Sequence, residues 1–433
     1  MHKSVWSDSV ELPEFEKLHG NKKTDVLIIG GGLCGILCAY SLKNAGIDYI
    51  LVEGSRIASG NTKNTTAKIT SQHGLIYNKL TEDFSAETAA LYLKANQIAL
   101  KEFKDLCENI DCDFETRDSF VYSLKSRAAI EKEVDAVNRL GFQARFSNET
   151  ELPFKIQGAV CFPDQAQFNP LKFISAISKN LNIYENTFVR EITPSSVITD
   201  DGKIYANKII ITSHFPFINK HGGYFLKLFQ HRSYVSAYAN CHNLKGMYVD
   251  EDEKGFSFRT HDNLLLIGGG SHRTGKKGGC WQEIDQFAKK YYNCSEPEYS
   301  WAAQDCMSLD KIPYIGRYSK NTPDLYVATG FNKWGMTSSM VASMILTDMI
   351  WGRKNDFIEV FSPQRSCFKS QLFVNSFESI TNLLTPTLKR CPHLGCALKW
   401  NKAEHSWDCP CHGSRFEKDG KLIDNPATGD AEI

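Results

Sequence analysis

A glycine-rich turn between a short apolar strand and a helix constrains the fold of this 433-residue chain most strongly. Residues 25–29, DVLII, form a branched apolar run typical of a buried strand, and the turn GGGLCG follows at once. Apolar residues then recur at helical spacing until Gly46. Glycines here allow a tight turn, close approach of the backbone to phosphate, and close packing of helix on strand. The pattern predicts an α/β dinucleotide-binding unit built on Gly30, Gly32 and Gly35.

A second strand and an acidic residue complete this unit. The apolar run Tyr49–Val52 ends at Glu53, eighteen residues beyond Gly35. A carboxylate at this point is placed to accept both hydroxyls of an adenosine ribose. Another glycine run, at 268–270, is not expected to bind a dinucleotide, because Arg273 stands at the third glycine position and no apolar helix follows.

Two short motifs near the carboxyl end combine cysteine with histidine. They are CPH at 391–393 and CPCH at 409–412. Thiolate sulfur favours iron–sulfur chemistry, and imidazole ligands raise the reduction potential of such a cluster. A zinc ion would also accept two cysteines and two histidines, but zinc modules usually pair cysteine with cysteine in one loop and histidine with histidine in another. The spacing therefore favours a two-iron, two-sulfur cluster with the ligands Cys391, His393, Cys409 and His412.

The stretches CPHLGC and CPCHGSRF resemble the cluster-binding loops of Rieske proteins. This resemblance implies the same four ligands and a disulfide between Cys396 and Cys411. In high-potential Rieske proteins, serine and tyrosine hydroxyls donate hydrogen bonds to the cluster sulfurs. Ser414 matches the serine, but Phe416 stands at the tyrosine position, so we expect an intermediate reduction potential.

The chain from about 24 to 355 resembles the D-amino-acid oxidase-like (glycine/sarcosine oxidase) superfamily. The polar segment 53–74, the segment FVREI and the turn TGFNKWGMT are similar to its flavin-contacting stretches. The phrases NTTAKIT, SWAAQDCMSLDKIPYIG and CPHLGCALKW resemble FAD-dependent oxidoreductases of this superfamily that carry a carboxyl-terminal Rieske domain. The resemblance implies FAD as cofactor, with these contacts besides the first glycines: Glu53, Thr65, Thr66, Lys68, Val189, Gly330, Gly335, Met336 and Thr337.

The implied fold class is α/β with an α+β substrate part. It comprises a Rossmann-like FAD-binding domain, an antiparallel-sheet substrate domain and a small all-β Rieske module. Strands before Cys391 are hard to find, so we expect a minimal hairpin that leans on the flavin domain. The expected divisions are an oxidoreductase domain at 1–355 (FAD-binding mainly at 24–80, 150–220 and 305–355, substrate mainly at 81–149 and 221–304), a connector at 356–385 and the Rieske module at 386–433.

The two cofactors together indicate a dehydrogenase, because a flavin takes two electrons from a substrate and a Rieske cluster takes one at a time. The superfamily resemblance points to the C–N bond of a small amine or amino acid. No arginine has the spacing of a carboxylate clamp, so an amino acid is not favoured over a simple amine. We expect electrons to leave through the cluster to an unknown acceptor, either a protein or a quinone-like carrier.

No acid–base pair stands out for catalysis. The candidates are His73, where the flavin-facing segment should end, and Trp301 with Asp305, just before the last flavin strand. A structural histidine and a core aromatic residue are the alternatives. Two other functions stay open: an oxidase that uses oxygen, with the cluster as redox sensor or structural element, and a non-enzymatic electron carrier or assembly protein.

Composition excludes some partners. Fifty basic and fifty acidic residues leave no net charge to attract nucleic acid or an anionic membrane. No run approaches the ~20 apolar residues of a membrane span, and the start lacks the apolar run of a secretory signal. We therefore expect a cytoplasmic protein in which the ten cysteines outside the motifs are reduced thiols.

Overall fold

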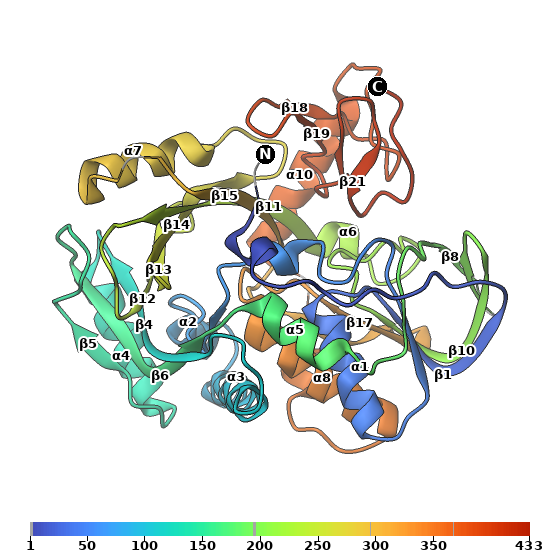
Figure 1. Cartoon of the computed structure of the whole chain (residues 1–433), viewed down its shortest axis with the longest axis horizontal. Helices are drawn as coiled ribbons and strands as arrows, with labels where there is room; N and C mark the ends of the chain where they lie inside the picture. The colour runs from blue at the N-terminus through green and yellow to red at the C-terminus, as the bar shows by residue number, and fades with distance from the viewer. Residues whose placement is uncertain (1–2, 194–195, 295, 367) are drawn as a thin grey trace.

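A computed structural model of the chain describes residues 3–193, 196–294, 296–366 and 368–433. Two large sheets, with helices beside them, make up most of the molecule, and a small third sheet lies at the carboxyl-terminal end (Figure 1). The first sheet is mixed with a parallel centre, and the other two are largely antiparallel. The α/β fold class with an antiparallel substrate part and a small all-β module is confirmed.

The first sheet has eight strands and carries the glycine-rich turn. These strands are β1 (Lys22–Ile29), β2 (Tyr49–Val52), β7 (Ile183–Tyr184), β8 (Val189–Ile192), β9 (Val197–Thr199), β10 (Gly202–Ile211), β16 (Tyr314–Ser319) and β17 (Thr322–Thr329). Their order is β16-β17-β10-β1-β2-β7, with β9 also paired to β10 and β8 paired to β9. The central strand β1 pairs in parallel with β10 and β2 and is buried on both faces, which explains its continuous apolar run.

Helices α1 (Leu33–Asn44) and α8 (Gly335–Trp351) pack against each other beside this sheet (Figure 1). Both are apolar on nearly all sides, as expected of helices inside a core. Helix α3 (Ala86–Cys107) packs against α8, and α5 (Pro170–Ser178) packs against α1.

The second sheet has nine strands and carries the substrate side. They are β3 (Lys68–Ile69), β4 (Glu115–Ser123), β5 (Arg145–Ser147), β6 (Gly158–Gln167), β11 (Leu228–Ala239), β12 (Met247–Asp250), β13 (Ser257–His261), β14 (Leu264–Arg273) and β15 (Tyr299–Ser308). The order is β15-β11-β14-β13-β12-β4-β6-β3, with β5 beside β6. The glycines at 268–270 lie inside β14, so they form no dinucleotide turn.

Helices cover the outside of this second sheet. Helix α7 (Cys280–Tyr292) packs on β14 and β11, and α4 (Arg127–Arg139) packs on β6 (Figure 1). Helix α4 ends just before Gly141, which adopts a positive φ of 90°, a conformation that glycine permits after a helix. The shorter elements are η1 (Val5–Asp8), η2 (Asn61–Asn64), α2 (Tyr77–Asp83), α6 (Tyr224–Lys227) and α9 (Ile358–Phe361).

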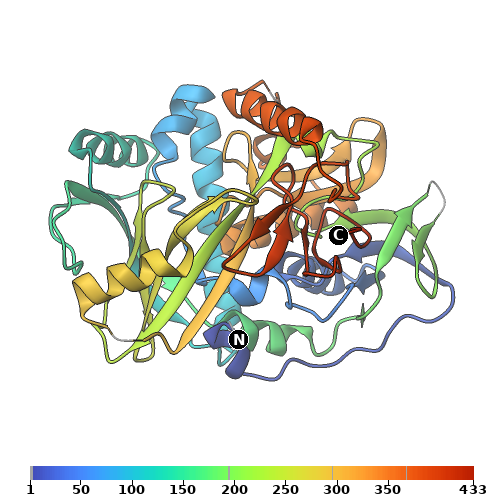
Figure 2. The same cartoon turned by 90° about the horizontal axis from the view of Figure 1, so that it is seen from above.

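The carboxyl-terminal module is larger than the predicted hairpin. It contains the antiparallel sheet β18 (Lys399–Asn401), β19 (Ser406–Asp408), β20 (Arg415–Phe416) and β21 (Leu422–Asp424), and a small apolar core of its own. Strands of two or three residues are too short to produce an alternating apolar pattern, so these four strands could not be predicted from the sequence. The expected connector contains helix α10 (Ser370–Leu384). Figure 2 shows the module lying over one end of the second sheet.

The expectation that all ten remaining cysteines are reduced is wrong for two of them. Cys241, just after β11, and Cys294, just after α7, form a disulfide. The two residues are 53 positions apart and meet because α7 packs against β11, a contact that cysteine spacing does not reveal. No helix within the described residues is both long enough and apolar enough to cross a membrane.

Candidate active site and cluster site

A cavity of about 1360 Å³ is lined by residues of both large sheets. This volume is enough for a dinucleotide and a small substrate together. Two residues predicted to contact the cofactor, Gly35 and Thr337, are not part of its lining. The ten that line it are Gly30, Gly32, Glu53, Thr65, Thr66, Lys68, Val189, Gly330, Gly335 and Met336.

The glycine-rich turn brings the start of α1 to the cavity. Gly30 has a positive φ of 113°, and a Cβ atom there would lie 2.8 Å from the Thr212 carbonyl oxygen. A Cβ atom on Gly35 would lie 1.9 Å from the Gly30 carbonyl oxygen, so Gly35 permits helix–strand packing and stays beneath the turn. At Gly32, by contrast, the nearest atom to a Cβ would be the Thr62 hydroxyl at 3.3 Å. Leu33 N donates to Thr62 Oγ1 at 3.0 Å, and the other N–H groups at the amino end of α1 fit a pyrophosphate.

Glu53 is held rigidly at the end of β2. Its Oε2 accepts a hydrogen bond from Gly31 N at 2.7 Å, and its Oε1 accepts one from Ser55 N at 2.9 Å. Burial raises the pKa of Glu53, and the N–H groups oppose that rise. Each carboxylate oxygen has a second lone pair, so the fixed side chain can also accept hydroxyls of a ribose.

The segment around Lys68 is held by two residues far away in sequence. Trp6 Nε1 donates to the Thr65 carbonyl at 2.8 Å, and Arg259 Nη1 donates to the Thr66 carbonyl at 2.7 Å. The Lys68 ammonium donates to Thr66 Oγ1 at 3.2 Å. Burial, assisted by the charge of Arg259, lowers the pKa of Lys68 to about 7. The result is a buried cation facing the cavity.

The second glycine turn precedes α8. Gly330, Asn332 and Lys333 all have positive φ, and the Asn332 carboxamide holds the turn by accepting from Ser308 N at 2.9 Å. No side chain caps the start of α8 at Gly335. Free N–H groups at a helix start stabilise negative charge, so this end of the cavity fits the ring of a reduced flavin.

His73 is fully occupied by protein contacts. Its Nδ1 shares a hydrogen bond with the Tyr92 hydroxyl at 2.7 Å, and its Nε2 shares one with Thr337 Oγ1 at 3.0 Å. Burial lowers the pKa of His73 to about 3, so the ring is neutral at physiological pH. These contacts favour a structural histidine, and they also keep Thr337 out of the cavity lining.

Trp301 and Asp305 lie on β15 and line the cavity. The Trp301 indole is buried and donates to the Asn64 carbonyl at 2.9 Å, which anchors η2. Burial raises the pKa of Asp305 and lowers that of Lys333, a half-buried lysine of the lining that the sequence did not single out. A single lysine in a glycine-containing turn carries no sequence signal of its surroundings, which is why the sequence did not indicate Lys333.

The four expected cluster ligands lie in the carboxyl-terminal module as two adjacent pairs, His393 with His412 and Cys391 with Cys409. The rings of His393 and His412 lie 5.0 Å apart at 85°. His393 Nε2 bonds Asn219 Oδ1 at 2.8 Å, while His393 Nδ1 and both nitrogens of His412 are buried without a hydrogen-bond partner. Unpaired buried nitrogens are costly, so these imidazoles fit metal ligation. Phe215 packs edge-on against both rings.

The sulfur side of the site is equally prepared. Cys409 donates to Cys391, which lowers the pKa of Cys391 to about 7. Backbone N–H groups of His393 and Leu394 also point at the Cys391 sulfur and favour its thiolate form. Two thiolates and two imidazoles are the donors that a Rieske [2Fe-2S] cluster requires.

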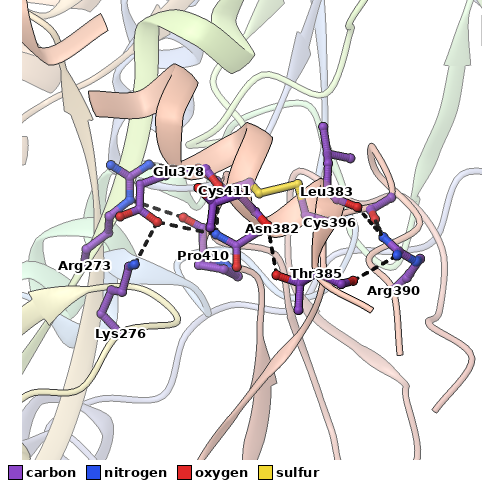
Figure 3. Close-up of a disulfide and its surroundings, with 12 residues drawn as sticks. Arg273, Lys276, Glu378, Asn382, Leu383, Thr385, Arg390, Cys396, Pro410 and Cys411 are labelled. Atoms are coloured by element: carbon purple, nitrogen blue, oxygen red, sulfur yellow. Dashed lines mark hydrogen bonds and ion pairs between the residues drawn. A yellow bond between two sulfur atoms is a disulfide. The ribbon is translucent and has the colours of Figure 1, made fainter. Parts of the chain in front are cut away.

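A disulfide joins Cys396 to Cys411 beside this site, the pairing that the Rieske resemblance implies (Figure 3). The sulfurs of Cys396, Cys409 and Cys411 lie within 4.8 Å of one another. Since two of the three are bonded to each other, Cys409 alone of this group is available to iron. Arg273 supports the disulfide loop by donating to the Pro410 and Cys411 carbonyls, each at 3.2 Å (Figure 3).

A buried ionic cluster attaches the module to the second sheet. Arg232 on β11 forms a two-point ion pair with Glu404, whose carboxylate also accepts from Tyr234 at 2.9 Å and from Arg415 at 2.8 Å. Gln230 adds a bond of 2.9 Å to the His412 carbonyl. The sequence gives no signal for this contact, because Arg232 and Glu404 are 172 residues apart.

We expect the substitution Phe416→Tyr to raise the reduction potential of the cluster. Phe416 is fully buried in the small core with the cluster cysteines, so a hydroxyl there would add a donor beside the sulfurs. One such bond contributes roughly 1–2 kcal/mol, which is about 40–80 mV for a one-electron couple. Redox titration checks this, with Phe120→Tyr on β4 as control; an unchanged or lowered potential would contradict it.

Comparisons with known proteins give consistent results. Residues 25–349 match the family described as FAD dependent oxidoreductase, and residues 365–432 match the Rieske [2Fe-2S] domain. The chain is 32% identical to YhfW of Bacillus subtilis (strain 168), named as a Rieske 2Fe-2S iron-sulfur protein, over 98% of this chain and 96% of that one.

Solved structures show the fold of the larger part. Glycine oxidase from Geobacillus kaustophilus superposes with a TM-score of 0.66 at 18% identity, covering 80% of this chain and 99% of that one. L-proline dehydrogenase from P. horikoshii superposes with a TM-score of 0.66 at 16% identity, covering 80% and 98%.

Proposed function

The chain belongs to the FAD-dependent oxidoreductase family and carries a Rieske [2Fe-2S] domain, and on this basis we propose that it is a dehydrogenase for the C–N bond of a small amine or amino acid. Its cofactors are FAD and a Rieske 2Fe-2S cluster. Bound FAD supplies a two-electron acceptor, and the cluster supplies a one-electron outlet. We retain the division into 1–355, 356–385 and 386–433 as part of this proposal, with Cys391, His393, Cys409 and His412 as cluster ligands.

One observation carries the proposal. The cavity that receives the two glycine turns is also lined by residues of the carboxyl-terminal module, among them Glu404, Arg415 and Asn425. The substrate side and the cluster module thus share a wall, an arrangement that suits electron transfer inside one molecule. A cluster serving only as a structural element would not need this shared cavity.

The lining favours a substrate with a carboxylate in addition to its amine. Lys68 is a buried cation, and in the described part of the chain it forms no ion pair with an acid. A buried charge needs a partner, and a substrate carboxylate would provide one. The related structures of glycine oxidase and L-proline dehydrogenase are of enzymes named for amino acids, which supports this choice over a simple amine.

We expect binding of a small carboxylate inhibitor to weaken as pH rises through about 7. Lys68, with a pKa of about 7, carries its charge below that pH and is neutral above it. Affinity should therefore fall about tenfold per pH unit on the alkaline side. Titrations of the flavin absorption spectrum between pH 6 and 9 measure this dependence.

The substitution Lys68→Met should abolish that pH dependence and leave weak, pH-independent binding. Lys79→Met is the matched control, since Lys79 is exposed at the edge of the same cavity and should leave the profile unchanged. A profile that survives in Lys68→Met would assign the titration to another group.

The function itself is tested by mixing the holoenzyme anaerobically with a panel of amines and amino acids. We expect flavin absorption to bleach first and cluster absorption to follow. If no compound bleaches the flavin, the dehydrogenase proposal is wrong and a non-enzymatic carrier is favoured. Rapid turnover with oxygen and no reduction of any external carrier would instead identify an oxidase.

A further inference from the structure

Helix α10 is oriented with its apolar side outward. Phe373, Phe377, Ile380 and Leu384 recur at helical spacing on one face, and their exposed fractions lie between 56% and 76%. The opposite face carries Asn375 and Asn382, which are exposed by only 2% and 4%. This is the reverse of a normal surface helix, in which the apolar face is buried.

Polar contacts fix this inverted orientation. Arg273 Nη1 donates to Asn375 Oδ1 at 2.9 Å, and Asn375 Nδ2 donates to the Leu226 carbonyl at 3.2 Å. Glu378 forms an ion pair of 2.7 Å with Lys276 (Figure 3). Rotating α10 to bury its apolar face would break all three contacts, so the exposure is built into the fold.

The apolar face continues toward the cluster. Leu388, four residues after the helix, is 98% exposed. Arg390 joins the end of α10 to the first cluster loop. Its guanidinium donates to the Leu383 carbonyl (Figure 3) and to the Gly395 carbonyl. Anything that covers this face therefore lies beside the loop that carries His393.

We propose that the apolar face of α10 binds the surface of a lipid bilayer with anionic headgroups. The basic residues Lys369, Lys389 and Arg390 flank the helix, and Lys369 also lies 3.8 Å from Asp83. Glu378, the only acid in the sequence from 366 to 395, is paired with Lys276. Basic ends around a phenylalanine- and leucine-rich face are typical of helices that lie in the membrane interface. This attraction is local, so it does not require a net charge on the whole chain.

The composition of the face favours lipid over protein. Its exposed members are phenylalanine, isoleucine, leucine and valine. Protein interfaces are enriched in phenylalanine, tyrosine, tryptophan, methionine and arginine. Of these types the exposed apolar residues of α10 include phenylalanine alone, and the rest are aliphatic, which suits a fluid hydrocarbon boundary.

The membrane position has a consequence that rests on the proposed function. Oxidation of an amine to an imine releases two electrons and two protons, and one quinone takes up the same number to become a quinol. A quinone dissolved in the bilayer would be reached from the cluster loop. The lipid contact itself requires no turnover.

Flotation of the holoenzyme with vesicles tests the contact. We expect the protein to float with vesicles of phosphatidylcholine and phosphatidylglycerol, and less with phosphatidylcholine alone. The double variant Phe377→Ser, Ile380→Ser should reduce the bound fraction about tenfold. The control variant Leu124→Ser, Tyr205→Ser removes exposed apolar residues outside α10 and should bind as the unmodified protein does.

Three results would overturn the proposal. The first is no flotation with anionic vesicles. The second is a dimer in light scattering that the Phe377→Ser, Ile380→Ser variant dissociates, since a second copy would then cover the face. The third is equal binding by both double variants. A holoenzyme that floats but whose flavin no amine reduces would sink the proposed function and leave the lipid contact standing.

Discussion

Replacing His412 with alanine is expected to stop electron delivery to an external carrier while substrate still reduces the flavin. His412 is buried with both ring nitrogens unpartnered, so its removal takes a ligand from the cluster. It does not line the cavity in which the substrate is expected. Carrier reduction should fall about 100-fold or more, whereas the anaerobic rate of flavin bleaching should change little. Stopped-flow absorption at flavin and cluster wavelengths separates the two.

A control variant in the same module is His405→Asn. His405 is exposed and has a positive φ of 53°, which asparagine tolerates. It should retain the cluster and full carrier reduction. Unchanged carrier reduction in His412→Ala would mean that electrons leave directly from the flavin, and the cluster would then be a sensor or structural element.

The second large effect is expected for Glu404→Gln, which should loosen the module from the second sheet. Arg232 and Arg415 are exposed by only 4% and 7%, and neutralising Glu404 leaves the Arg232 charge buried without an acid partner. Breaking one side of a buried ion pair costs about 3–5 kcal/mol. Cluster loss on heating, followed by absorption, should therefore occur at lower temperature than in the unmodified protein.

Acid should produce the same loosening. Burial alone would raise the pKa of Glu404, but the charges of Arg232 and Arg415 outweigh it and lower the pKa to about 2. A carboxyl whose folded pKa is depressed stabilises the fold above its ordinary value of 4.5 and loses that effect as pH falls toward 2. The variant Glu417→Gln removes an exposed acid of the same module and should change neither heat nor acid sensitivity. Equal behaviour of both variants would refute a role of Glu404 in attachment.

The nucleotide-binding half was predictable because its signals are local. The strand at 25–29, the glycines and Glu53 lie within thirty residues, and Gly30 and Gly35 occupy positions where a Cβ atom would clash with the backbone. The Cys-x-His and Cys-x-x-His motifs are local in the same way. Each fixes one thiol and one imidazole on a single tight loop.

The remaining features depend on contacts between distant segments. The buried state of Lys68 follows from Trp6 and Arg259, and the attachment of the module follows from Arg232. The identity of a residue as lysine or glutamate does not predict whether its side chain will be buried. The inverted orientation of α10 was missed for the same reason, since an amphipathic pattern does not say which face meets the protein.

The bond from Asn219 to His393 has an evolutionary consequence. Asn219 and Phe215 belong to the oxidoreductase domain, yet both contact His393, a proposed cluster ligand carried by the other domain. A Rieske module transplanted from this chain to another flavoprotein would arrive with an exposed imidazole and altered redox properties. The two domains are thus expected to be inherited as one unit. Among relatives, substitutions at 215–219 are expected to occur together with substitutions in the loop at 391–396.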